Sequence, residues 1–193
     1  MKCAVKSLNG SFKFPQTKIH VLLNDKLIVY IRLWSGPDQE QKIVDEISGY
    51  ISAADADLEV TTPFEYIESL SSQTNKLRVA ILLANEALFN DNKDKYLQGF
   101  ELAAVYKNKN EVSFTSIGRF SIFAEKKGKK FSIYAHGGYM DDNVLLPTAL
   151  LGIEKTPDMQ CASVSAKDLD SIIIESLYDS HTYWKSIIND FTD

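Results

Sequence analysis

A histidine and two neighbouring acids are the most evident metal-binding candidates in this sequence. His136 is followed by two glycines and then by Asp141 and Asp142. Carboxylates and an imidazole can share one divalent cation. Adjacent residues of an extended segment point to opposite sides, however, so both acids rarely reach the same ion. We therefore interpret this stretch as a solvated loop and keep Asp141 and Asp142 only as substitute metal ligands.

Nucleophilic catalysis has little support in the sequence. The only cysteines, Cys3 and Cys161, are too few for a cysteine zinc site or a disulfide framework. An N-terminal-nucleophile hydrolase needs a Cys, Ser or Thr released as its first residue, whereas Cys3 lies behind Met1 and Lys2. No Gly-x-Ser-x-Gly elbow and no glycine-rich phosphate loop is present.

A run of four lysines surrounds Gly128, at residues 126–130. Such a cluster can contact a phosphate or an acidic protein. Lysines around a glycine are more typical of a hairpin turn that stays in water, and that is our interpretation. The stretch after Gly138 holds ten acidic residues and three lysines, a balance of −7, whereas residues 1–138 carry +2. This lopsided charge is a mild argument for a charged protein partner.

Length and composition favour a single folded domain over residues 1–193. The chain is 45% hydrophobic and carries a net charge of −5, which argues against a general nucleic-acid binder. Its longest apolar stretch, 79–84, is far shorter than the roughly 20 residues that span a bilayer. The start of the chain also lacks the apolar run of a signal peptide. We expect a cytoplasmic protein with no membrane partner.

The first half of the sequence predicts a hairpin and two helices. Residues 19–23 and 27–33 are strand-like and are separated by a turn at Asn24 and Asp25. Apolar residues at helical spacing then predict a helix from Pro37 to about Ala53. A second, long helix to about Asn90 is predicted from a capping box in which Thr62 is the N-cap, followed by Pro63 and Glu65.

The second half has a period of two, which is typical of strands. Residues 100–106, 112–114, 120–124 and 131–133 predict one antiparallel meander. Two further strands are predicted at 159–165 and 170–174, and a short closing helix at 182–191. This order predicts an α+β fold, a four-layer sandwich of two antiparallel β-sheets flanked by helices. Both the metal-dependent phosphatase sandwich and the N-terminal-nucleophile hydrolase sandwich fit it.

Several short segments resemble the protein phosphatase 2C family of metal-dependent Ser/Thr phosphatases. Ala84–Phe89 is similar to an Ala-Asn-x-x-Leu helix segment, and Gly99–Glu101 keeps the glycine of the Gly-Thr-Thr that follows it. Ile117–Ser121 keeps only the glycine of Val-Gly-Asp-Ser-Arg. Leu146–Gly152 is similar to Leu-Thr-x-Ala-Leu-Gly. The shared order of these segments supports the resemblance, which implies a phosphatase 2C-like fold.

The resemblance fails at the positions that would bind metal. Members of the family hold two divalent cations with aspartates, and the cations order the water that attacks phosphorus. One aspartate follows the early strand, where this chain has Arg32 and no nearby carboxylate, and another corresponds to Ser176. The family's last aspartate precedes a final strand that the sequence does not reveal, and its phosphate-binding arginine has no counterpart in residues 1–18.

The resemblance with these departures implies a pseudophosphatase, the fold without the metal centre. We expect no catalytic residue, no cofactor, and a protein-binding or scaffold role, with a link to a bacterial-type Ser/Thr phosphorylation pathway. Trp34 would lie at the rim of the former active site, where it is a candidate binding residue. The alternative is a divergent phosphatase that holds manganese or magnesium with Asp141, Asp142 or Asp179. An N-terminal-nucleophile hydrolase is the second alternative.

Overall fold

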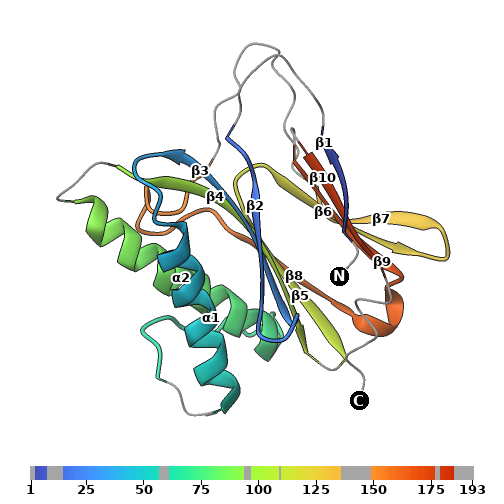
Figure 1. Ribbon diagram of the computed structural model, residues 1–193. Helices are drawn as coiled ribbons and strands as arrows, with labels where there is room; N and C mark the ends of the chain where they lie inside the picture. Colours follow the sequence, from blue (N-terminus) through green and yellow to red (C-terminus); the bar gives the residue numbers. More distant parts are fainter. Residues whose placement is uncertain are drawn as a thin grey trace.

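The computed structural model describes residues 3–7, 15–56, 61–93, 97–108, 110–135, 149–176 and 179–184. Two five-stranded antiparallel sheets lie face to face, and two helices cover the outer face of one sheet (Figure 1). The predicted α+β fold with two packed antiparallel sheets and helices is confirmed, while a fourth layer of helices on the second sheet is not among the described residues. Within the described ranges both helices pack on the same sheet, so the layers run helices, sheet, sheet.

The helix-covered sheet has the strand order β2-β3-β4-β5-β8. Its strands are β2 Lys18–Leu22, β3 Leu27–Ser35, β4 Gly99–Asn108, β5 Glu111–Ile117 and β8 Gln160–Ser165. The predicted hairpin is confirmed, because Leu22 pairs with Leu27 across a turn that contains Asn24 and Asp25. Along β3 the buried side chains alternate, with Ile31 facing the helices and Tyr30 facing the other sheet.

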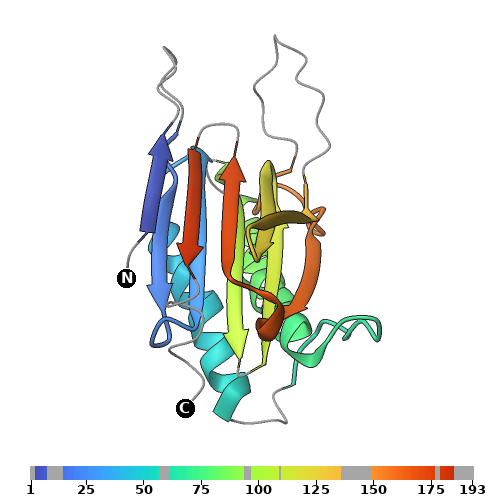
Figure 2. The ribbon, with the colours of Figure 1, turned by 90° about the vertical axis from the view of Figure 1, so that its right-hand side faces the viewer.

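The second sheet has the order β1-β10-β9-β6-β7 and faces the viewer in Figure 2. Its strands are β1 Cys3–Ser7, β10 Asp179–Trp184, β9 Ser171–Ser176, β6 Phe120–Lys126 and β7 Lys129–Tyr134. The lysine-rich turn at 126–130 joins β6 to β7, as predicted, with positive φ angles at Lys127 and Gly128. The strands predicted at 159–165 and 170–174 are β8 and β9.

The prediction of one meander between residues 100 and 133 is wrong in its pairing. β4 pairs with β5 in the helix-covered sheet, whereas β6 pairs with β7 and β9 in the second sheet. The chain changes sheets at Gly118, whose φ of +87° allows a sharp turn. A period of two identifies strands, but it does not indicate which sheet each strand joins.

Helix α1, Glu40–Ala56, confirms the first predicted helix with its limits moved by about three residues towards the C-terminus. Its buried face consists of residues at helical spacing, among them Ile43, Ile47 and Ile51. These side chains join a core with the helix-facing residues of the sheet, such as Ile31 and Leu102. A separate core fills the space between the two sheets.

Helix α2, Ser72–Asn92, starts nine residues later than the capping box predicts. Thr62 Oγ1 accepts a hydrogen bond from Phe64 N at 3.1 Å, but no helix begins there. The actual N-cap is Ser71, whose hydroxyl accepts from Thr74 N at 3.1 Å. The Asn75 amide also bonds Ile67 N and O at 2.9 Å, which holds the preceding segment in an irregular conformation. Tertiary hydrogen bonds therefore override the local helix signal.

The predicted closing helix at 182–191 is wrong in its first part. Residues 182–184 belong to strand β10, which pairs with both β1 and β9. The remaining residues of that prediction lie outside the described ranges. No helix in the described part of the chain is long and apolar enough to cross a membrane.

Candidate functional site

A buried ion pair occupies one end of the core between the two sheets. Arg32 of β3 and Glu101 of β4 lie directly opposite each other in the sheet register. Arg32 Nη1 donates to Glu101 Oε2 at 3.1 Å, and neither side chain has exposed surface. Both residues lie on the face of their strands that points to the second sheet, as strand alternation from Tyr30 and Ala103 requires.

Arg32 also connects the two sheets. Its Nη2 donates to Ser176 Oγ of β9 at 2.9 Å and to Thr17 Oγ1 at 2.5 Å. The guanidinium carbon lies 5.2 Å from the centre of the Phe120 ring, a distance at which cation–π attraction operates. The structure thus brings Arg32 and Ser176 together, the two positions at which the sequence departs from the phosphatase pattern.

Glu101 is the central acceptor of this cluster. Its Oε2 also accepts from the Trp34 indole Nε1 at 2.8 Å, and its Oε1 accepts from Arg119 N at 2.9 Å. The close approach requires glycine at position 118, because a Cβ there would lie 2.5 Å from Glu101 Cγ. Sequence reasoning missed Glu101. A charged residue inside an otherwise apolar strand was the signal, since such a residue needs a buried partner.

Two divalent cations do not fit this arrangement. The described residues include no group of three or more His, Cys, Asp or Glu side chains that could hold a metal. The oxygens of Glu101 already accept hydrogen bonds from Arg32, Trp34 and Arg119. An arginine stays protonated at ordinary pH, so Arg32 would repel a nearby cation. The donor set is that of a charge-neutralised structural cluster rather than of a hard-cation site.

The other predicted site residues are distributed as follows. Asp141 and Asp142 lie outside the described residues. Asp179 is the first residue of β10, opposite Ser7 in the sheet register. Trp34 is only partly exposed. Its indole Nε1 donates to Glu101, so this edge of the ring faces the cluster.

The segments that do match the phosphatase pattern contact one another through Asn85, Phe100, Leu151 and Gly152. Asn85 Oδ1 of α2 accepts from Gly152 N at 2.8 Å, and Asn92 Nδ2 donates to Gly152 O at 2.6 Å. A Cβ at Gly152, whose φ is +88°, would lie 2.5 Å from Leu88 Cδ2. Phe100 and Leu151 exchange two backbone hydrogen bonds beside them. These residues fasten the segment after residue 149 to α2 and β4.

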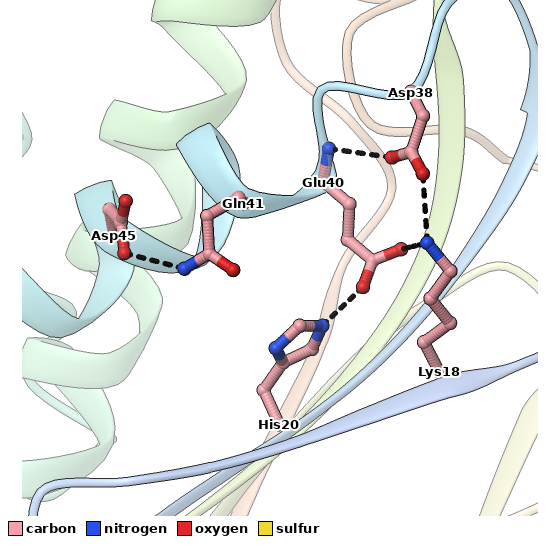
Figure 3. Close-up of polar contacts among 6 residues, drawn as sticks. All are labelled: Lys18, His20, Asp38, Glu40, Gln41 and Asp45. Atoms are coloured by element: carbon pink, nitrogen blue, oxygen red, sulfur yellow. Dashed lines mark hydrogen bonds and ion pairs between the residues drawn. The ribbon is translucent and has the colours of Figure 1, made fainter.

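A second polar cluster, on the helix side of the sheet, is shown in Figure 3. Lys18 Nζ lies 2.8 Å from Asp38 Oδ2 and 2.9 Å from Glu40 Oε2, and Glu40 also contacts His20. Hydrogen bonds from Lys18 and from Glu40 N lower the pKa of Asp38. These contacts attach β2 to the start of α1. The cluster is partly exposed, and its hydrogen bonds and ion pairs join Lys18, His20, Asp38 and Glu40 to one another, so we assign it a structural role.

The fold matches solved structures of bacterial serine/threonine phosphatases. Phosphatase Stp1 from Staphylococcus aureus is 14% identical, with 91% of this chain and 75% of that chain covered, at a TM-score of 0.57. PppA, a key regulatory component of T6SS in Pseudomonas aeruginosa, is 15% identical, with 90% and 74% covered, at 0.58. The catalytic domain of PstP in complex with two manganese ions is 13% identical, with 90% and 75% covered, at 0.57.

These similarities establish the fold of phosphatase 2C-type bacterial enzymes for this chain. At such low identity they establish the fold alone. No protein-family model and no curated protein matches the sequence.

Proposed function

We propose that this chain is a phosphatase 2C-like domain without metal-dependent phosphatase activity that acts by binding a protein partner. The observation that carries the proposal is the Arg32–Glu101 ion pair of 3.1 Å, buried between the sheets and bonded to Ser176. The resemblance implies metal-binding aspartates at this end of the sandwich. A guanidinium there opposes the cations that a two-metal hydrolysis needs.

The distribution of matches and departures supports the same proposal. The matching residues Asn85, Gly99 and Gly152 make contacts that hold the scaffold together. The departures, Arg32 and Ser176, lie where chemistry would occur and bond to each other. A scaffold that is kept while its metal ligands are replaced favours a binding role over hydrolysis.

The surface beside the ion pair supports a protein as the partner. Trp34 is partly exposed, and two apolar side chains near the same strand end are more exposed, Leu97 at 61% and Ile153 at 38%. A Cβ at Gly99 would lie 3.3 Å from Ser35 Oγ and 3.4 Å from Ile153 Cγ1, so Ile153 lies close to the end of β3. Partly exposed aromatic and aliphatic residues are frequent anchors in protein interfaces. A component of a Ser/Thr phosphorylation pathway is the partner class that the fold favours.

Hydrolysis of an aryl phosphate, with and without manganese, tests the proposal. We expect no manganese-dependent turnover by the wild type or by Ser176→Asp, because Arg32 remains in place. An active bacterial phosphatase of the same fold, assayed alongside, validates the conditions. Under this proposal the thermal unfolding midpoint should not respond to manganese or EDTA, since the described residues include no group of three or more His, Cys, Asp or Glu side chains that could hold a metal.

Manganese-dependent turnover by the wild type would overturn the proposal. It would point to the divergent phosphatase instead, and alanine at Asp141, Asp142 or Asp179 should then abolish the activity. In an inert wild type, Trp34→Ala should weaken capture of the partner. It should also lower the unfolding midpoint, because it removes the hydrogen bond from Trp34 Nε1 to the buried Glu101 carboxylate. Thr62→Ala, a substitution elsewhere in the described chain, serves as the matched control.

A further inference from the structure

Strand β8 is an edge strand of the helix-covered sheet, and no described strand pairs with its outer side. It ends the helix-covered sheet and pairs only with β5, from Gln160 opposite Ser116 to Ser165 opposite Glu111. Within the described chain, no backbone hydrogen bond joins its other side to another segment. In an antiparallel strand every second residue directs its N–H and C=O outwards, so about three residues of β8 can pair with an added strand.

The other edge strands carry charges that β8 lacks. β2 contains Lys18, β1 contains Lys6, and β7 contains Lys129 and Lys130. Lysines on an edge discourage pairing with a further strand, because pairing would desolvate their charges. β8 has the sequence QCASVS, with no charge and no proline, and its pairing with β5 is regular. It is the unprotected edge among the described strands.

A cavity of about 80 Å³ lies beside β8, in the gap between the two sheets. Apolar side chains form most of its wall, namely Phe114 of β5, Ile122 of β6, Ile133 of β7 and Ala162 of β8. A cavity of about 150 Å³ holds a benzene molecule, so this one suits a single aliphatic side chain. A strand added beside β8 would direct alternate side chains towards the space between the sheets.

An acidic residue lies next to this cavity. Asp158 is exposed and forms no ion pair with a described residue, and its one hydrogen bond, from Gln160 Nε2, is long at 3.5 Å. Tyr134 lines the cavity, and its pKa is raised mainly by its own burial and further by the negative charge of Asp158. Asp158 therefore offers an uncompensated negative charge at the N-terminal end of β8, which is complementary to a basic residue.

We propose that β8 binds an extended segment of a partner protein as an additional antiparallel strand. One aliphatic side chain of that segment fills the cavity, and a basic residue towards its C-terminal end pairs with Asp158. Backbone hydrogen bonds supply affinity in this mode, and side-chain pockets supply specificity. The inference rests on the proposed binding role and specifies the chemistry of the partner: extended, aliphatic and basic at one end.

The test uses the full chain and a fluorescein-labelled peptide of about eight residues, a typical strand length, that alternates threonine and leucine and ends in lysine. Fluorescence polarisation measures its affinity. Amide hydrogen exchange of residues 160–165 locates the binding, and we expect these amides to become protected. A peptide with N-methyl groups on alternate amides should lose most of the affinity, because it cannot pair with an edge.

Two pairs of variants separate the cavity from the charge. Ala162→Leu fills the cavity and should weaken binding at least about tenfold, whereas Ala53→Leu on the exposed side of α1 should leave binding unchanged. Asp158→Asn should weaken binding several-fold and reduce its salt dependence, whereas Asp45→Asn should not. Asp158→Asn is a surface change, so it tests the proposal even if Ala162→Leu does not fold.

Absence of peptide binding, equal affinity for the N-methylated peptide, or unchanged exchange in β8 would each overturn the inference. If the protein alone forms a dimer that protects the β8 amides, the occupant is a second copy and the proposed partner is wrong. None of these outcomes alters the phosphatase assay. If the protein neither hydrolyses the aryl phosphate nor binds the peptide, the proposed function stands and this inference is wrong.

Discussion

Arg32 and Glu101 face each other on neighbouring strands, and their side chains form an ion pair of 3.1 Å with no exposed surface. Such a pair is a weak source of net stability, because the desolvation of both charges offsets their attraction. Here the ion pair fixes the positions of the groups around it. Arg32 reaches Ser176 of the second sheet, while Glu101 holds the backbone of Arg119 where the chain changes sheets.

Removing one partner of this pair should be far more costly than removing both. In Arg32→Met the Glu101 carboxylate stays buried with no cation among its described contacts, which should reduce the free energy of unfolding by about 3–5 kcal/mol. The double variant Arg32→Met/Glu101→Leu should recover a large part of this loss. Urea unfolding gives the free energy of unfolding of the wild type, the single variant and the double variant. Equal losses in the single and double variants would contradict a coupled pair.

Gly118 should tolerate replacement much less well than Gly128, another glycine with a positive φ in the second half of the chain. Gly118→Ala combines a φ of +87° with a Cβ only 2.5 Å from Glu101 Cγ, so both the backbone and the ion pair must shift. Gly128→Ala is the matched control, because Gly128 also has a positive φ, +72°, but its Cβ would meet nothing within 4 Å. We expect the Gly118 variant to lose at least about 1 kcal/mol more in urea unfolding. Equal losses would show that only backbone strain matters.

Sequence patterns predicted most of the elements because the local signals were strong. The hairpin, α1, and strands β4 to β9 follow from apolar spacing and turn residues. The start of α2 and the strand β10 could not be predicted in this way. The first depends on the contact between Asn75 and Ile67, and the second depends on pairing with β1 from the other end of the chain.

The candidate site was only half visible in the sequence. The resemblance drew attention to Arg32 and Ser176, and the structure places them 2.9 Å apart. Glu101 went unnoticed because its significance lies in the register that sets it opposite Arg32. Register across strands that are distant in sequence is a tertiary property, and single-residue patterns do not encode it.

Asn85 should be essential for stability although it is remote from the ion pair. Its side chain accepts from Gly152 N and donates to Glu154 O and Lys155 O, at 2.8, 3.0 and 3.1 Å. Asn85→Ala leaves these backbone groups without that partner, at a cost of about 1–3 kcal/mol for each group that stays buried. Asn90→Ala, on the exposed side of the same helix, is the control and should change the thermal unfolding midpoint little. Thermal unfolding of the two variants gives the comparison.

Tyr106 should make the fold sensitive to alkaline pH. Burial, and then the hydrogen bond of 2.6 Å to the Asp55 carboxylate and its charge, raise the pKa of the Tyr106 phenol above its ordinary value of 10.0. The folded state therefore keeps a proton that the unfolded state releases. The stability from this group is complete below pH 10 and is lost as the pH rises further.

Tyr106→Phe tests this dependence, because phenylalanine cannot ionise. The variant should be less stable at neutral pH by about 1 kcal/mol, the typical net contribution of a hydrogen bond. Its stability should then fall less steeply than that of the wild type as the pH rises above 10. Parallel curves for Tyr106→Phe and the wild type would mean that another group controls alkaline unfolding.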